Sequence, residues 1–399
     1  MYRIACFATP IYSHFTNVHS IVSALGKSGA QIGIWTNPEF HPLLPKDCVG
    51  FYALDRHGWI DSLLDPSMPR PVRFTVDAVL NFDSTLKSVK QWKPDLILVE
   101  GFSLLGRLIA DELNCPWILL NASHIPNGES YRNLVRDEFP AIFSDVCLKS
   151  VEQLKTRFGH SDPSPFSYII DPSPFGTIHF EPSQWPDYKD SGHRDVYYWG
   201  SSSQAAPSLK ERTIPSYKNL RIYAAFGTIM WRYWATEALK TLNNLADICL
   251  EMEISLTIGL GGTAISANET RNLKNKKAII KSNANQIYEL KNNDLFLTHH
   301  GLNSTHEAVR QLIPMISVPF AGDQNSLAER AQCFKLALVG TSHLATKKNI
   351  PSAYCFGKLI TASVEAYKSS QEHSHVALEW DHYARESRPN ILKAIFERI

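Results

Sequence analysis

Short apolar runs alternate with amphipathic segments along the first half of the chain. The runs with the length and composition of buried strands are residues 4–7, 31–35, 96–99 and 117–120. Between the first two runs, a helix is indicated by apolar residues at helical spacing, namely Val18, Ile21, Val22 and Leu25, and Gly29 follows at its expected end. Residues 104–113 predict a helix between the last two runs. Strands that alternate with helices are typical of a parallel α/β sheet.

The same alternation begins again in the second half. Residues 221–225 and 254–258 are predicted strands, and residues 235–249 form the helix between them. A glycine cluster at residues 259–262 is interpreted as a turn, because such a cluster alone is a weak signal for phosphate binding.

Composition separates the two halves. Proline and serine are frequent at residues 159–190, which predicts irregular structure there. Residues 201–207 are rich in serine and alanine and resemble a linker. The pattern therefore predicts two α/β halves.

One strand-to-helix turn in the second half has the features of an anion-binding site. A strand-type run at residues 295–297 leads into a glycine-containing polar turn at residues 301–304. Glycine lets a ligand approach the backbone, and the first amides of the following helix are unpaired and carry the positive end of its dipole. Pro314 is expected to stop this helix, and the loop with Asp323 and Gln324 leaves the same sheet edge after the next strand.

This segment has two alternative interpretations, a helix cap and a metal site. Ser304 and Glu307 have the spacing of a capping box, so both could merely complete the start of the helix. A cap can also face a ligand, so the two roles are compatible. His306 lacks the second histidine four residues on that a zinc-binding helix supplies, and no metal site is predicted.

Composition and charge narrow the classes of function. The 399 residues carry a formal net charge of +1, which lacks the excess of Lys and Arg that nucleic-acid binding needs. The seven cysteines are scattered without disulfide or metal spacing, which favours a reducing compartment. The first residues have a strand pattern and not that of a signal peptide, and no apolar run is long enough to span a membrane. We expect a soluble cytoplasmic protein without an integral membrane segment.

Residues 298–307, together with Gly322-Asp323-Gln324, resemble the donor-binding motif of family 1 glycosyltransferases. These are the UDP-sugar and TDP-sugar enzymes that glycosylate antibiotics, macrolides and plant metabolites. Their motif reads Thr-His-Gly-Gly-x-Asn-Ser, then a short helix with a Glu, and later Gly-Asp-Gln. Here His300 replaces the first of the paired glycines, and its side chain either narrows the diphosphate site or points elsewhere.

The resemblance covers nearly the whole chain and implies the GT-B fold, in which two Rossmann-like α/β domains face each other across a cleft. Residues 1–205 would form the N-terminal acceptor-binding domain. Residues 206–375 would form the C-terminal domain that binds the nucleotide-sugar donor. Residues 376–399 would form a helical tail that crosses back to the N-terminal domain.

The resemblance also implies roles for individual residues on the donor side. It assigns the diphosphate to Thr228, His299, Gly301, Asn303 and Ser304. It assigns the nucleoside to Asn283, Gln286 and Glu307, and the transferred sugar to Asp323 and Gln324. Relatives often have Trp-x-Pro-Gln where this chain has Asn283-Ala284-Asn285-Gln286, and the missing aromatic ring leaves the choice among UDP, TDP and GDP open.

Two features next to these residues have a second interpretation. Thr228 could only cap the helix that follows it. Trp231 and Trp234 share one helix face, which would either line the acceptor cleft or pack in the core.

On the acceptor side, His14 lies on the predicted loop after the first strand, where family members usually have their general base. Histidine suits this task because its unperturbed pKa is near neutrality. Glu100 follows the run at residues 96–99 at the same sheet edge, and a carboxylate there would fix the tautomer of the histidine. The simpler alternatives are a histidine at a helix start and a solvated acid at a strand end.

The resulting hypothesis is an inverting, metal-independent hexosyltransferase that needs no cofactor besides its nucleotide-sugar co-substrate. Its acceptor is expected to be a hydroxyl of a small, partly apolar natural product, held by loops around residues 56–82 and 124–145. The chain would act as a monomer or homodimer. Two rivals stay open, a nucleotide-sugar epimerase of the same fold and a catalytically inactive protein that binds a nucleotide sugar or a partner.

Overall fold

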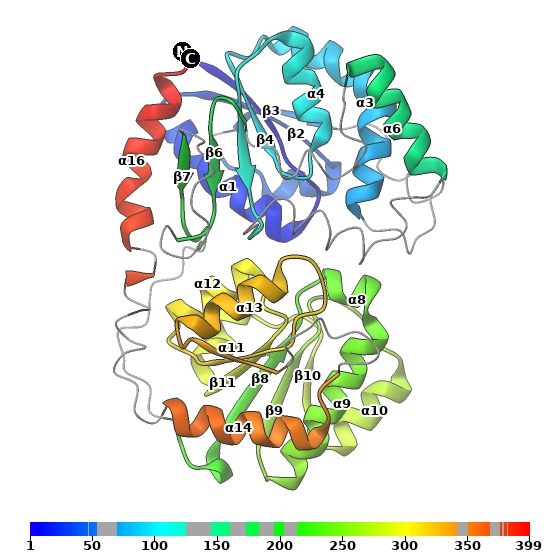
Figure 1. The fold of residues 1–399 in the computed structure, drawn as a ribbon, viewed down its shortest axis with the longest axis vertical. Coiled ribbons are helices and arrows are strands. Elements are labelled where there is room, and N and C mark those ends of the chain that lie inside the picture. The colour runs from blue at the N-terminus through cyan, green and yellow to red at the C-terminus, as the bar shows by residue number, and fades with distance from the viewer. Residues whose placement is uncertain are drawn as a thin grey trace. The chain divides into compact units, whose positions relative to one another are not determined.

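The computed structural model describes residues 1–46, 48–53, 70–124, 145–159, 173–182, 195–202, 214–340, 350–367, 376, 379–380 and 382–399. The chain forms two compact units (Figure 1). Unit 1 consists of Met1–Ser202 with Tyr383–Ile399, and unit 2 of Ser203–His382. The division thus falls at residue 202 where 205 was predicted, and the returning tail begins at Tyr383 where residue 376 was predicted. Large parts of the expected acceptor loops and linker lie outside the described residues, at 54–69, 125–144 and 203–213.

Unit 1 is built on a parallel sheet. Among its described residues, the sheet has seven strands in the order β3-β2-β1-β4-β5-β6-β7, and every adjacent pair is parallel. The strands are β1 (Arg3–Phe7), β2 (Gln31–Thr36), β3 (Cys48–Ala53), β4 (Leu96–Glu100), β5 (Trp117–Asn121), β6 (Thr177–His179) and β7 (Val196–Tyr198). The four strands expected from apolar runs are confirmed to within one residue at each end.

Helices connect and cover these strands. They are α1 (Tyr12–Lys27), α3 (Arg70–Trp92), α4 (Leu104–Leu113), α6 (Asp145–Phe158) and α16 (His382–Phe396), with a 3-10 helix η1 (Pro38–Leu43). α3 packs between α4 and α6 (Figure 1). Every residue of β4 and β5 is buried. Strands that are covered on both faces become continuous apolar runs, which explains why the sequence revealed them.

Unit 2 repeats this architecture. Its sheet has six parallel strands in the part of the unit that the structure describes, in the order β10-β9-β8-β11-β12-β13. The strands are β8 (Arg221–Ala225), β9 (Ser255–Gly259), β10 (Ile279–Lys281), β11 (Leu295–Thr298), β12 (Met315–Ser317) and β13 (Ala337–Val339). The helices are α8 (Ile229–Tyr233), α9 (Ala235–Glu251), α10 (Ala267–Asn275), α11 (Gln286–Asn292), α12 (Leu302–Arg310), α13 (Gln324–Cys333) and α14 (Ala353–Tyr367), with the 3-10 helix η3 (Tyr217–Asn219).

The core of unit 2 decides between the two interpretations of the tryptophans. Trp231 is 5% exposed and belongs to the hydrophobic cluster between α9 and the sheet. Trp234 is partly buried and packs against the same cluster. Core packing therefore accounts for both rings.

Two predicted helix ends differ from the structure. α1 begins at Tyr12, so His14 lies in its first turn and not on the loop before it. α12 ends at Arg310, four residues before Pro314. The residue before a proline disfavours helical backbone, and Leu312 has already turned left-handed with φ of +55°. This turn returns Ile313 to the core, where it is buried.

The tail contacts both units through different residues. Arg388 on α16 donates from Nε to the carbonyl of Trp199 (2.8 Å) and from Nη2 to the carbonyl of Ser201 (2.7 Å), both in unit 1. Trp380 belongs to unit 2, and its Nε1 donates to Nδ1 of His306 on α12 (2.8 Å). None of the helices in the described ranges is long and apolar enough to cross a membrane.

Candidate active site

The strand order of unit 1 reverses between β1 and β4. The chain extends the sheet from β1 to β2 and β3 on one side, and from β4 to β5, β6 and β7 on the other. In open α/β sheets, ligands bind outside the carboxyl ends of the strands at such a reversal. His14 follows β1, and Glu100 is the last residue of β4. The fold therefore brings both candidate catalytic residues to the reversal point.

The side chains of His14 and Glu100 are hydrogen-bonded. Nδ1 of His14 lies 2.7 Å from Oε1 of Glu100. A carboxylate that is ionised only accepts, so this contact favours the tautomer with the proton on Nδ1 and leaves Nε2 as the nitrogen that can act as a base. The side chain of His14 is 14% exposed and that of Glu100 is 1% exposed. A carboxylate in this place fixes the tautomer and stabilises the imidazolium when the ring takes up a proton.

The protein holds the other carboxylate oxygen of Glu100 as well. The hydroxyl of Thr9 and the backbone amide of Phe102 both donate to Oε2, the latter at 3.3 Å. Glu100 is thus not the solvated strand-end acid of the alternative interpretation. The helix-start interpretation describes the position of His14 correctly, but it does not account for the bond to a buried carboxylate.

Aromatic side chains lie next to this pair. The ring centroid of Phe102 is 5.0 Å from that of His14, and the ring of Phe74 is 6.5 Å from that of Phe102. Tyr12, two residues before His14 on α1, is 58% exposed. The surroundings of the imidazole are therefore largely apolar on this side.

A second histidine and glutamate pair in unit 1 was missed by the sequence reasoning. Nδ1 of His124 lies 2.7 Å from Oε2 of Glu181, and Nδ1 of His179 lies 3.4 Å from Oε1. The side chains of His124 and Glu181 are 2% and 1% exposed. Burial alone would raise the pKa of Glu181, but the two histidines outweigh it and lower the pKa to about 2. The carboxylate of Glu181 stays ionised in the folded protein because two histidine side chains contact it.

These residues follow β5 and β6, on the same edge of the sheet as Glu100. The available signal was a polar residue shortly after each strand. It was hidden because β6 is only three residues long and lies in the proline- and serine-rich stretch that was expected to be irregular. His124 and Glu181 are also 57 residues apart, beyond any local pattern.

The strand order of unit 2 reverses between β8 and β11. Thr228 follows β8, and residues 299–304 follow β11. The N-cap of α12 is Gly301, and the first helical bond runs from the amide of Thr305 to the carbonyl of Gly301 (3.0 Å). The amides of residues 302–304 precede this first helical bond and lie at the positive end of the helix dipole.

His299 packs into the glycine-lined part of this turn. A Cβ at Gly301 would lie 2.6 Å from Nε2 of His299, and a Cβ at Gly227 would lie 3.1 Å from the same ring. Only glycine permits both approaches. Burial lowers the pKa of His299 to about 4, against the opposing effect of the Ala225 carbonyl, so the ring is neutral near pH 7.

The two capping interpretations are wrong. Thr228 occupies the N-cap position of α8 but its side chain makes no capping hydrogen bond, and the residue is exposed. Ser304 lies within the first turn of α12, whose N-cap Gly301 has no side chain to cap with. The hydroxyl groups of Thr228 and Ser304 are thus not used to complete helix starts.

Ser304, Glu307 and Gln286 are brought together as a polar cluster. Nε2 of Gln286 donates to Oε2 of Glu307 (2.6 Å) and to Oγ of Ser304 (3.2 Å). Burial raises the pKa of Glu307, and the bond from Gln286 opposes this shift. Asn283 is exposed on the preceding loop, with its Oδ1 beside Gly262. Gln286 and Glu307 thus form one group with the start of α12.

The side chains of Asp323 and Gln324 make different contacts. Asp323 is the N-cap residue of α13 and makes no capping bond with its side chain. Gln324 is buried, and its Oε1 accepts from the amides of Phe320 (2.8 Å) and Ala321 (3.2 Å). Its Nε2 donates to the sulfur of Met230 (3.5 Å). In this structure Gln324 therefore holds its own loop.

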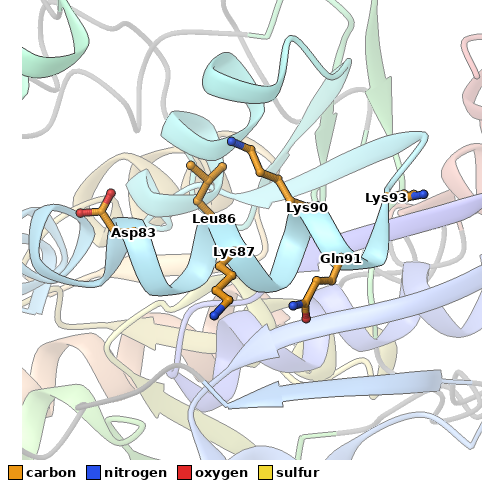
Figure 2. Close-up of a pocket in the computed structure, with 6 residues that line it drawn as sticks. All are labelled: Asp83, Leu86, Lys87, Lys90, Gln91 and Lys93. Atoms are coloured by element: carbon orange, nitrogen blue, oxygen red, sulfur yellow. The ribbon is translucent and has the colours of Figure 1, made fainter.

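Two further features of the described residues do not form a candidate site. The described residues contain no group of three or more His, Cys, Asp or Glu side chains that could hold a metal ion. Figure 2 shows a pocket on α3 lined by Asp83, Leu86, Lys87, Lys90, Gln91 and Lys93. Its lysines point in different directions, and this part of α3 leads into the start of β4, at the sheet edge opposite Glu100.

The chain is similar in sequence and structure to known proteins. Residues 284–353 match the family model described as UDP-glucoronosyl and UDP-glucosyl transferase. NDP-glycosyltransferase YjiC of Bacillus subtilis is 23% identical over 388 residues, which cover 93% of this chain and 90% of YjiC. The crystal structure of the glycotransferase of kitacinnamycin aligns with a TM-score of 0.74 at 15% identity, over 100% of this chain and 99% of its own. Glycosyltransferase SsfS6 of Streptomyces sp. SF2575, complexed with thymidine diphosphate, aligns over 100% of both chains with a TM-score of 0.58 at 16% identity.

The structural likenesses show the fold, and the two parallel α/β units are those of a GT-B protein. The matched segment includes the donor motif around α12, and the curated relatives are glycosyltransferases. The chain is a glycosyltransferase, and the resemblance to family 1 that the motif predicted is confirmed.

Proposed function

We propose that this enzyme transfers a sugar, with inversion, from a UDP-sugar or TDP-sugar to a hydroxyl of a small, partly apolar natural product. The observation that carries the proposal is the His14–Glu100 bond at the strand reversal of unit 1. It supplies an oriented base in the unit that corresponds to the acceptor-binding domain of the family. The reaction uses no metal and no cofactor besides the nucleotide sugar.

In this mechanism Nε2 of His14 takes the acceptor proton as the hydroxyl attacks the anomeric carbon. The imidazolium that forms is stabilised by Glu100, whose carboxylate is already desolvated and bound to Nδ1. A positioned base of this kind contributes about 10² to 10⁴ in rate. The aromatic rings of Phe102 and Phe74 beside it favour an acceptor with apolar carbon near the reacting hydroxyl.

On the donor side, the leaving diphosphate is held at the start of α12. The amides of residues 302–304 and the hydroxyls of Thr228 and Ser304 supply donors, and the helix dipole adds positive potential. His299 and Gly301 shape the turn, and Asn303 completes the diphosphate contacts. Support comes from the matched UDP-sugar family segment and from the thymidine diphosphate complex of SsfS6.

The remaining donor contacts follow from the polar cluster of α12. Glu307, oriented by Gln286, binds the ribose hydroxyls, and Asn283 lies on the exposed loop on the nucleoside side. Asp323 binds hydroxyls of the transferred sugar. Gln324 serves mainly by holding the Asp323 loop, because its carbonyl oxygen is bonded to two backbone amides.

The test is a thermal-shift screen with UDP, TDP and GDP and their sugar conjugates, followed by an assay of nucleotide release. A ligand that binds only the folded state raises the apparent stability by RT ln(1 + [L]/Kd). We expect a shift with UDP or TDP compounds, and nucleotide release that depends on an acceptor such as a hydroxylated aromatic natural product. Release of nucleotide without any acceptor would contradict sugar transfer and favour the epimerase, and no shift with any nucleotide would favour an inactive binding protein.

A further inference from the structure

His300 keeps a backbone conformation that usually belongs to glycine. Its φ is +65°, in the left-handed region that side chains rarely adopt and glycine adopts freely. It stands between His299 and Gly301 in the turn that leads into α12. A strained residue at a binding turn persists when its surroundings fix it, so the question is what its side chain contributes.

The side chain of His300 is directed into unit 2 and does not narrow the diphosphate site. It is fully buried, and its Nδ1 lies 2.5 Å from Oγ of Ser317. Ser317 is the last residue of β12 and pairs in register with Thr298 on β11. The backbone amide of His300 in turn donates to Oγ1 of Thr298 (3.1 Å). The turn is thereby fastened to the ends of two adjacent strands.

Charge does not explain the choice of histidine. Burial, together with the neighbouring His299, lowers the pKa of His300 to about 3, so the ring adds no positive charge near pH 7. Its Nε2 is buried without a hydrogen-bond partner, which is unfavourable. A glycine at this position would have neither the unpartnered ring nitrogen nor the strained backbone. The link to Ser317 is the contribution that only the side chain provides.

We propose that His300 and Ser317 are a positioning pair that holds the amides of residues 301–304 ready for the donor diphosphate. This inference rests on the donor site proposed above. Fixed backbone dipoles stabilise a developing charge without reorganisation, so a fastened turn binds the diphosphate more tightly than a mobile one. His300 acts through the turn and does not touch the donor.

The test compares three variants with the wild type, all as the full chain. Ser317→Ala removes the hydroxyl and leaves the turn sequence intact, whereas His300→Gly removes the imidazole and leaves the left-handed backbone accessible. We expect each to weaken UDP or TDP binding about tenfold by calorimetric titration, the effect of losing one hydrogen bond and its ordering. The double variant should bind no more weakly than the weaker single variant, because both changes remove the same link.

Ser363→Ala is the matched control. Ser363 is also a fully buried serine of unit 2, on α14, and its Oγ has no hydrogen-bond partner. Its replacement should leave nucleotide affinity at the wild-type value. Wild-type affinity in Ser317→Ala, or additive losses in the double variant, would overturn the positioning pair.

Amide hydrogen exchange without nucleotide separates this inference from the proposed function. Peptides that contain residues 299–304 should exchange faster in Ser317→Ala and His300→Gly than in the wild type or Ser363→Ala. If the wild type binds neither nucleotide, the proposed function fails. The exchange rates alone then test whether His300 and Ser317 order the turn. Faster exchange then supports the ordering role of His300 and Ser317, and unchanged exchange refutes it.

Discussion

In the described part of unit 1, two histidine and glutamate pairs have the same short bond and different access to solvent. His14–Glu100 and His124–Glu181 both join Nδ1 to a carboxylate oxygen at 2.7 Å. The side chain of His14 is 14% exposed, whereas that of His124 is 2% exposed. The carboxylate of Glu100 also accepts from a hydroxyl and a backbone amide, whereas that of Glu181 faces a second histidine, His179.

The difference shows that the bond alone does not make a catalytic pair. A general base must reach the proton that it removes, which an exposed imidazole edge permits and an enclosed one prevents. An enclosed carboxylate with two histidines instead joins the segments that follow β5 and β6. We therefore expect the first pair to affect rate and the second to affect stability.

The largest expected effect is on rate. His14→Ala should lower the sugar-transfer rate by about 10² to 10⁴, because it removes the base that accepts the acceptor proton. Nucleotide binding and the melting temperature should stay near the wild-type values. The measurement is kcat with saturating donor and acceptor.

His19→Ala is the control for this change, because His19 is a half-buried histidine on the same helix and has no place in the mechanism. A loss in His19→Ala as large as that in His14→Ala would remove the distinction between the base and an ordinary helix residue.

The second pair should show the opposite pattern. Glu181→Gln leaves two buried histidines without their carboxylate, and a buried polar group that loses its partner costs about 1 to 3 kcal/mol for each histidine. The free energy of unfolding should fall by this amount in urea titrations, with most of the rate retained by the remaining folded protein. Glu152→Gln, at an exposed position on α6, is the control and should change stability by less than about 0.5 kcal/mol.

The pH dependence of stability sharpens this prediction. The pKa of Glu181 in the folded protein is lowered to about 2 from a reference value of 4.5. A carboxyl group with a lowered folded pKa contributes stability that is fully present above its unfolded pKa and is lost as the pH falls through the folded pKa. The wild type should therefore lose up to about 3 kcal/mol between pH 5 and pH 2 from this group, and Glu181→Gln should lack that part of the decline.

Urea titrations of both proteins at pH 6, 4 and 3 give the comparison. Parallel profiles of unfolding free energy against pH in the wild type and Glu181→Gln would show that the carboxylate of Glu181 has the same environment in the folded and unfolded chains. That result would contradict the enclosed His124–Glu181 pair.

The first pair could be found from the sequence and the second could not. Glu100 ends a strand whose residues are all buried, so the apolar run located it, and His14 follows the first such run. Glu181 follows a strand of three residues in a segment without periodicity. Apolar runs reveal strands that are long and covered on both faces, and they reveal the residues at the ends of those strands.

Side-chain direction is a second limit of the sequence. The motif located Gln324 and His300 at the edge of unit 2, but both side chains turn inward, to the amides of Phe320 and Ala321 and to Ser317. Neither direction follows from spacing, because each depends on which buried polar groups of the neighbouring loop or strand need a partner.

His306, another buried histidine, extends the comparison to a neutral partner. Nδ1 of His306 on α12 accepts from the indole of Trp380 at 2.8 Å, and the two rings meet edge to face with centroids 5.7 Å apart. Trp380→Phe keeps an aromatic ring and removes the N–H donor. Because no charge is left unbalanced, the expected loss is about 1 to 2 kcal/mol, smaller than for Glu181→Gln. Calorimetric melting of the two variants measures the difference. An equal loss of stability in Trp380→Phe and Glu181→Gln would mean that burial of the histidine, and not the charge of its partner, determines how much each pair stabilises the protein. The contrast between His124 and His14 would then depend on burial alone.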